Sequence, residues 1–190
     1  MIALCGVLLV LYLIIRWLEV HPGAASGLVV LLVLGCGGAI WAIRARMNAR
    51  RRREAELTAS IESTNGLTGP QFEQWVAMLM RRTGFTQVQV CGGAGDLGAD
   101  VIAVTPTGCR VVVQCKCYDP GRTVGSPDVQ KLAGTARAIH GADVAVIVTT
   151  ARFTRSAQTT ADQLGIVLVD RRQLAWWAAY GSIPAEVCTT

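Results

Sequence analysis

Two long apolar stretches near the start of the chain constrain its fold more than any other feature. They cover residues 2–20 and 27–43, and Arg16 and Glu19 are the only formal charges in the first 43 residues. A helix needs roughly 20 apolar residues to cross a bilayer. The short HPGAAS segment between the stretches is rich in turn-forming residues. We therefore expect a transmembrane helical hairpin over residues 1–43, with membrane lipids as its partners.

A run of arginines follows directly. Six arginines lie between Arg44 and Arg53, and positive charge beside a membrane helix marks the cytoplasmic side. We expect a multi-pass protein of the cell membrane, with a basic connector over residues 44–66 and the C-terminal domain in the cytoplasm. Contact with lipid headgroups explains the arginines, and contact with DNA is the alternative. A cleaved signal peptide is the alternative for the first stretch, although the MIALCG start has no basic residue.

Cysteines and charge narrow the function classes. The seven cysteines show no spacing typical of a disulfide framework, which fits a reducing compartment. Cys115 and Cys117 lie one residue apart without a second pair, which is weak support for zinc. From Leu67 onward the chain has eleven Arg and Lys residues against nine Asp and Glu, a net charge of +2. Charge alone therefore does not indicate that this part binds nucleic acid.

Residues 67–190 alternate between helical and strand patterns. Thr68 and Gln71 fit a capping box, and apolar residues then recur at helical spacing. We expect helices over residues 68–85, 126–141, 153–165 and 171–181, and strands over residues 86–90, 100–104, 109–116, 143–150 and 166–170. Ser126 is the expected N-cap of the second of these helices. This order predicts an α/β domain with a mixed sheet flanked by helices, preceded by the two transmembrane helices.

Residues 93–98 match the pattern G-x-G-x-x-G. A dinucleotide-binding fingerprint must open a helix, because the helix N-terminus holds the pyrophosphate. Here the glycines lead into the apolar run Asp100 to Val104, which reads as a strand. We therefore reject a dinucleotide site and expect the glycines to allow a tight turn close to a ligand.

The next two expected strands bring polar groups together. Alternate residues of a strand share a face, so Gln114 and Lys116 point the same way and the turn folds them back beside Asp100. Cys115 and Cys117 then face the core. A carboxylate can hold Mg²⁺ beside a phosphate, and a nearby lysine can stabilise the developing negative charge. An ordinary salt bridge between Asp100 and Lys116 is the structural alternative.

Several motifs in this order resemble the Mrr-type restriction endonuclease family, within the PD-(D/E)xK nuclease superfamily. The resemblance covers about residues 67–180. The matching pieces are Phe72-Glu73, the loop Gly95-Asp96-x-Gly98-x-Asp100, Val113-Gln114-Cys115-Lys116, Ile147-Val148-Thr149-Thr150, Phe153-Thr154, Ala157, Ala161 and Asp170. The family implies a restriction-endonuclease-like fold and a domain over residues 67–190.

The resemblance also implies roles. Asp100 would bind the metal and Lys116 would be the catalytic lysine. Gln114 would take the place of the second acid as a metal ligand, and Glu73 would add an acid near the metal. Asp96 would shape the loop or support the metal's surroundings. Mg²⁺ is the implied cofactor, with Mn²⁺ as a substitute, and DNA, foreign or modified, is the implied substrate.

Two departures keep other functions open. No separate DNA-reading domain is visible in the sequence, and Gln114 stands where an acid is usual in such nucleases. A non-catalytic, membrane-tethered module that binds nucleic acid or protein is the alternative. A membrane interaction protein, in which Asp100 and Lys116 only pair, is a third interpretation. A homodimer is expected if the domain's weak charge needs a second copy to hold DNA.

Overall fold

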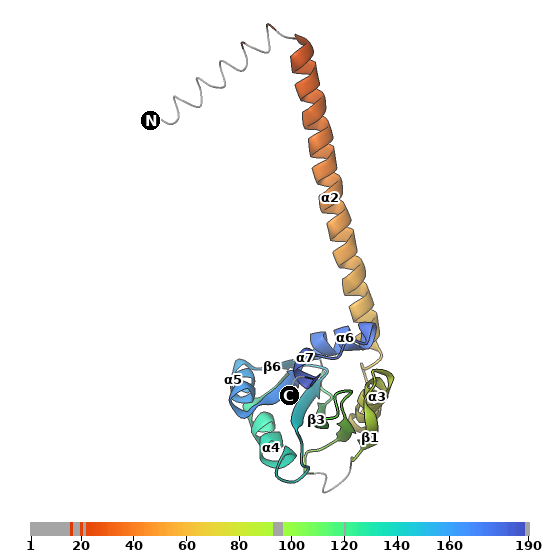
Figure 1. Ribbon diagram of the computed structural model, residues 1–190, viewed down its shortest axis with the longest axis vertical. Coiled ribbons are helices and arrows are strands. Elements are labelled where there is room, and N and C mark those ends of the chain that lie inside the picture. The colour runs from red at the N-terminus through yellow and green to blue at the C-terminus, as the bar shows by residue number, and fades with distance from the viewer. Residues whose placement is uncertain (1–15, 17–19, 21, 93–96, 120, 189–190) are drawn as a thin grey trace, which may run out of the picture. The chain divides into compact units, whose positions relative to one another are not determined.

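A computed structural model describes residues 16, 20, 22–92, 97–119 and 121–188. The chain divides into two units, residues 1–53 and 54–190, and helix α2 (Pro22–Glu62) belongs to both. The other elements, labelled in Figure 1, are α3 (Gly69–Arg82), β1 (Thr86–Val90), β2 (Val101–Val104), β3 (Arg110–Lys116), β4 (Thr123–Val124), α4 (Ser126–Ala136), β5 (Val144–Thr149), β6 (Arg152–Phe153), α5 (Arg155–Leu164), β7 (Ile166–Val169), α6 (Arg171–Tyr180) and α7 (Ala185–Cys188).

The expected membrane hairpin is only partly covered by the described residues. The stretch over residues 2–20 lies almost entirely outside them. In the described part of the chain, no helix is both long enough and apolar enough to span a membrane. The turn expected over HPGAAS is wrong from Pro22 to Ser26, because these residues are already helical. Proline suits a first helical turn, where its missing N–H would have no partner.

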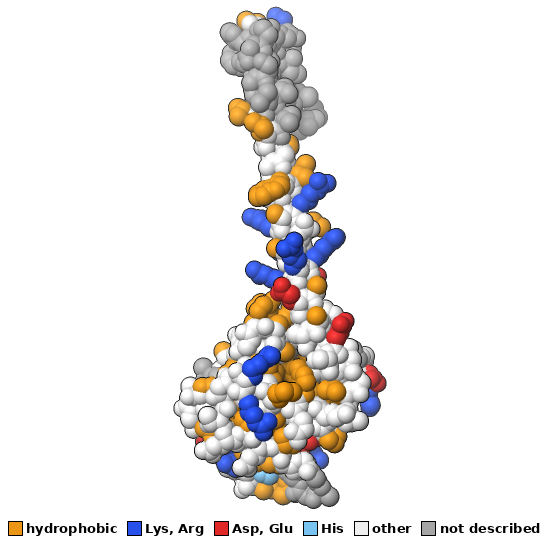
Figure 2. Space-filling view, turned by 90° about the vertical axis from the view of Figure 1, so that its right-hand side faces the viewer, with side chains coloured by type: hydrophobic (Ala, Val, Ile, Leu, Met, Phe, Trp, Pro, Cys, Tyr) orange, Lys and Arg blue, Asp and Glu red, His pale blue; other side chains and the backbone are white. Residues whose placement is uncertain are grey.

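Helix α2 continues without a break through the arginine run. Figure 2 shows basic and apolar side chains along it. Leu34, Trp41 and Ile43 are each more than half exposed. The connector is therefore helical over most of its length, and it ends at Gly66, whose positive φ of 78° suits a turn.

The second unit is built on a five-stranded sheet with the order β1-β2-β3-β5-β7. The first three strands pair antiparallel, and the β3–β5 and β5–β7 pairs are parallel. The predicted mixed sheet is confirmed. Strands β4 and β6 form a separate two-residue parallel pair that the sequence did not suggest, because two residues carry no readable alternation.

Helices cover both faces of the sheet, as Figure 1 shows for α3 on one side and α4 and α5 on the other. Val111 and Val113 of β3 join a core with α3 and α6, whereas Val112 joins a core with α4 and α5. This alternation is the period of two expected of a strand. Strand β3 is therefore buried on both faces, which fixes its register.

Helix boundaries follow local capping chemistry. The Thr68 N–H donates to Gln71 Oε1 at 2.9 Å, which confirms the expected pairing at the start of α3. Asp170 caps α6 in the same way, with Gln173. The N-cap of α4 is Gly125 rather than Ser126, and the helix ends at Ala136, five residues before the expected end.

Candidate active site

The β2–β3 hairpin places Asp100 beside Gln114. Val101 pairs with Val113, and the Asp100 N–H donates to the Val113 carbonyl at 2.9 Å. The carbonyl of Asp100 accepts from Cys91 N at 2.8 Å. The hydrogen bonding of the sheet therefore begins one residue before β2, at Asp100. It fixes the backbone of Asp100 between β3 and the residue that follows β1. The strand after the glycines also confirms that they do not open a dinucleotide-binding helix.

The carboxylate of Asp100 is held by the backbone of β3. Its Oδ2 accepts a hydrogen bond from Cys115 N at 2.6 Å, at the residue between Gln114 and Lys116. A hydrogen bond to an ionised acceptor is short and strong, so it aligns the carboxylate with the strand end. The three residues that the sequence singled out in the hairpin are thus brought together, as expected.

Gln114 is buried, with 3% of its surface exposed. Its Oε1 has no hydrogen-bond partner among the described residues. Leaving a buried acceptor unpaired costs about 1–3 kcal/mol, so a partner other than the described residues is expected. An amide oxygen and a carboxylate are ligands that Mg²⁺ accepts, and the pair formed by Gln114 and Asp100 therefore fits a hard divalent cation.

Glycine is required near this amide. A Cβ on Gly98 would lie 3.1 Å from Gln114 Nε2, and the φ of Gly98 is +90°. A side chain would therefore both crowd the amide and strain the backbone. The expectation that the glycine loop allows close approach is met at Gly98, but the approaching group is Gln114.

Glu73 reaches the site from α3. A Cβ on Gly92 would lie 2.6 Å from Glu73 Oε2, so this carboxylate packs against the backbone that follows β1. Burial raises the pKa of the Cys115 thiol well above its usual range, and the charges of Asp100 and Glu73 raise it further. The carboxylates of Asp100 and Glu73 therefore both lie near the end of β3, although they come from different elements of the fold.

Lys116 forms an ion pair with Asp128, at 2.9 Å between Nζ and Oδ1. The side chains are 19% and 28% exposed. Burial works to lower the pKa of Lys116, but the hydrogen bond and charge of Asp128, helped by Tyr118 and Asp100, raise it overall. The sequence reasoning missed Asp128, because only the packing of α4 on the sheet brings it to the strand end.

Two buried threonines fix the backbone after Lys116. Thr149 Oγ1 donates to the Lys116 carbonyl at 2.7 Å. Thr150 Oγ1 accepts from Tyr118 N at 2.8 Å and donates to the Tyr118 carbonyl at 2.6 Å. The end of β5 therefore holds the end of β3 on both sides of Cys117, and Lys116 has little backbone freedom.

The remaining expectations have mixed outcomes. Asp96 lies outside the described residues. Cys115 and Cys117 pack against the core shared with α3, as expected. The described residues contain no cluster of three or more His, Cys, Asp or Glu side chains suited to a metal. The site thus offers Asp100 and the Gln114 amide, with Glu73 nearby, rather than an all-acid or thiolate cage.

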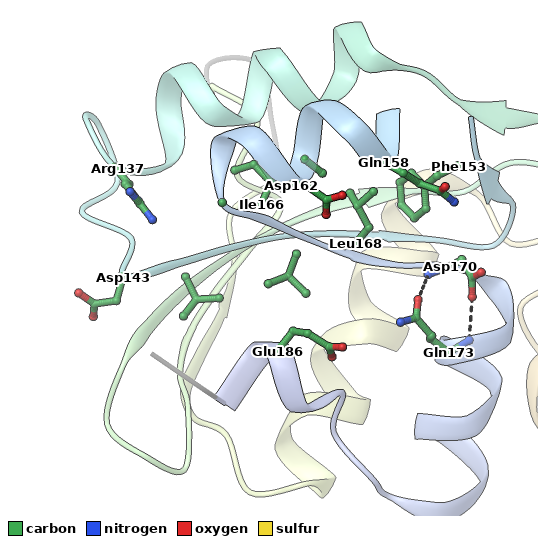
Figure 3. Close-up of a pocket in the computed structure, with 14 residues that line it drawn as sticks. Arg137, Asp143, Phe153, Gln158, Asp162, Ile166, Leu168, Asp170, Gln173 and Glu186 are labelled. Carbon is green, nitrogen blue, oxygen red and sulfur yellow. Dashed lines mark hydrogen bonds between the residues drawn. The ribbon is translucent and has the colours of Figure 1, made fainter. Parts of the chain in front are cut away.

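A cavity of about 660 Å³ lies elsewhere, along β7. Figure 3 shows its walls, with Asp162 and Phe153 on one side and Glu186 on the other. None of the expected site residues lines it. The residues that the hairpin brings together therefore lie outside this cavity.

Comparison with known proteins identifies relatives of the second unit. A family model for the Mrr catalytic domain, described as restriction endonuclease, matches residues 64–178. The type IV methyl-directed restriction enzyme EcoKMrr of Escherichia coli (strain K12) is 34% identical over 129 residues, 64% of this chain and 41% of that protein. The chain therefore spans about two fifths of that relative's length.

Solved structures resemble the chain more weakly. The DNA modification-dependent restriction endonuclease AspBHI has a TM-score of 0.49 and 22% identity, covering 70% of this chain and 38% of that chain. The MspJI restriction endonuclease in complex with a 27-mer oligonucleotide has a TM-score of 0.43 and 26% identity, covering 66% and 30%.

Proposed function

Because the chain belongs to the restriction endonuclease family defined by the Mrr catalytic domain, we propose that it is a divalent-metal-dependent DNA endonuclease attached to a membrane. The observation that carries the proposal is the convergence of Asp100, Gln114 and Lys116 at one strand end, with a buried amide oxygen that has no partner among the described residues. Foreign or modified DNA is the proposed substrate.

Each residue has a role that follows from its chemistry. Asp100 and Gln114 offer oxygens to Mg²⁺ or Mn²⁺, and Glu73 adds negative charge nearby. When bound, such a cation supplies a Lewis acid at the scissile phosphate and lowers the pKa of a bound water. Lys116, whose pKa is raised by the hydrogen bond and charge of Asp128, stabilises the negative charge that develops on the phosphate.

Membrane attachment is a separate part of the proposal. Its support is the apolar sequence over residues 2–20 and 27–43, the adjoining arginines, and the exposed apolar side chains of α2. Exposed apolar surface of this kind is normally covered by lipid or by another protein. Recovery of the full-length chain in the membrane fraction after a carbonate wash tests it, and recovery in the supernatant overturns it without affecting the nuclease.

The nuclease is tested by nicking of supercoiled plasmid, methylated and unmethylated, with Mg²⁺, Mn²⁺ or EDTA. Asp100→Asn and Lys116→Met should abolish metal-dependent cutting. Asp162→Asn and Lys131→Met change the same residue types outside the site and should leave it intact. A folded chain that binds DNA but cuts neither plasmid would instead favour the non-catalytic module that the glutamine at position 114 keeps open.

A homodimer is also proposed, because one domain with a net charge of +2 has few cations to offer DNA. Light scattering of the full-length chain with and without duplex DNA tests this. A monomer in both conditions would contradict it.

A further inference from the structure

An exposed arginine lies over a tyrosine just beyond the catalytic lysine. The Cζ of Arg122 lies 4.8 Å from the centroid of the Tyr118 ring. The Arg122 N–H donates to the Asp119 carbonyl at 2.9 Å, so a turn brings the arginine back over the ring. In the described part of the chain, no hydrogen bond or ion pair engages the guanidinium. Its charge is therefore available to a ligand.

Tyr118 lies on the same face as the candidate catalytic residues. It packs against the core that Val112 joins, the core between the sheet and α4. Val112, Gln114 and Lys116 share this face by strand alternation, and Tyr118 also influences the pKa of Lys116. Lys116 and Tyr118 are two residues apart, and two residues of extended chain cover about 6.6 Å. This length is on the order of two base-pair rises of about 3.4 Å each along duplex DNA.

The backbone of Tyr118 is fixed by hydrogen bonds to Thr150. Thr150 holds both the N–H and the carbonyl of Tyr118. Arg171 in turn donates to the Thr150 carbonyl at 3.2 Å and to Asn65 Oδ1 at 2.9 Å. Groups from β5, α6 and the segment before α3 therefore hold one residue, Tyr118, so the surface under Arg122 is preorganised.

A small polar pocket opens beside the pair. It has a volume of about 140 Å³, and Asn65, Gly66, Asp119 and Thr150 line it together with Tyr118 and Arg122. The volume is too small for a base pair. Asp119 also lines the pocket, and its carboxylate repels a phosphate but not an uncharged sugar.

We propose that Arg122, stacked on Tyr118, binds a backbone phosphate of the DNA strand one or two nucleotides from the scissile phosphate, with the adjoining deoxyribose against the pocket. This rests on the proposed function and adds a strand-positioning subsite to it. Arginine binds phosphate through a planar fork of donors, and stacking on an aromatic ring holds that fork in place. A phosphate contact fixes the register of the strand over the lysine without reading its sequence.

The test measures how tightly the full-length chain binds a short labelled DNA duplex, with fluorescence anisotropy as the readout. Ca²⁺ replaces Mg²⁺ to prevent cutting. Arg122→Ala should weaken binding about tenfold and make the negative slope of log K against log salt less steep by about 0.9, the value for one phosphate contact. Arg122→Lys should keep the slope but bind less tightly. Tyr118→Leu should weaken binding, and Tyr118→Phe, which keeps the ring, should not.

Arg137→Ala is the matched control, because Arg137 is an exposed arginine at the opposite end of α4. It should change neither affinity nor slope. If Arg122→Ala behaves like Arg137→Ala while the wild-type chain still cuts DNA, this inference is overturned and the proposed function stands. If the wild-type chain neither binds nor cuts methylated or unmethylated DNA, both are overturned.

Discussion

Lys116 and Asp128 form an ion pair across 2.9 Å that joins the end of β3 to the first turn of α4. The lysine is the residue that the family resemblance assigns to catalysis, and the aspartate had no assigned role. The ion pair therefore connects Lys116 to α4, which covers the face of the sheet opposite to α3 and Glu73. Burial works to lower the pKa of Lys116, but the hydrogen bond and charge of Asp128, helped by Tyr118 and Asp100, raise it overall.

Asp128→Asn should lower the pKa of Lys116, since the hydrogen bond and charge that raise it are weakened or lost while the burial remains. A lysine whose folded pKa is raised adds stability that is complete below the unfolded pKa of about 10.4. That stability is lost as the pH rises through the folded pKa. The Lys116 contribution to the stability gap between wild type and variant should therefore shrink as the pH rises, first through the folded pKa of Lys116 in the variant and then through its raised pKa in wild type.

Titration of the Lys116 side chain by NMR measures this pKa shift directly, and denaturation at several pH values measures the stability gap. Asp162→Asn, in α5, is the control. An unchanged Lys116 pKa in Asp128→Asn would mean that the ion pair does not set its charge.

Gly98→Ala should destabilise the fold by about 1–2 kcal/mol, the cost of a left-handed backbone for a residue with a side chain. It should also reduce cutting, because the new Cβ would lie 3.1 Å from Gln114 Nε2. Chemical denaturation and plasmid nicking measure the two effects. Gly134→Ala is the control: a Cβ there meets nothing within 4 Å, and alanine suits a helix better, so stability should rise.

Gln114→Glu should lower the melting temperature of the metal-free chain. It buries a second carboxylate beside Asp100, where repulsion and desolvation both act against it. Mg²⁺ should then raise the melting temperature more than it does in wild type, because a cation stabilises the state that binds it. Gln89→Glu, on an exposed position of β1, should show neither effect. Equal responses to Mg²⁺ in wild type and Gln114→Glu would argue against a metal at this amide.

Thr150→Val should cost about 1–3 kcal/mol, because both backbone groups of Tyr118 lose their partner. DNA affinity should fall as well, since the hydroxyl of Thr150 holds the backbone of Tyr118, the residue on which Arg122 stacks. Thr150→Ser keeps the hydroxyl and should restore both. Among the described residues, the hydroxyl of Thr135 bonds to carbonyls of its own helix alone, so Thr135→Val should change stability little. A Thr150→Ser variant as impaired as Thr150→Val would point to packing rather than hydrogen bonding.

The apolar alternation of β3 and the glycines before β2 were readable in the sequence because strand period and positive-φ turns are local properties. The alternation of β3 predicted that Cys115 points inward. Together with the turn before β3, it also predicted that Gln114 and Lys116 lie near Asp100, within a mixed sheet. The start of α6 at Arg171 was readable for the same reason. The N-cap of α4 was misplaced by one residue, because glycine and serine are both acceptable N-caps and only the backbone geometry decides between them.

The tertiary structure alone decided what surrounds those residues. Asp128 meets Lys116, Thr150 holds Tyr118, and Arg171 braces Thr150, across sequence separations of 12, 32 and 21 residues. No local pattern encodes these contacts, because they depend on how helices pack on the two faces of the sheet. The sequence by itself thus determined which strand end carries the polar groups, and packing determined their charge, rigidity and neighbours.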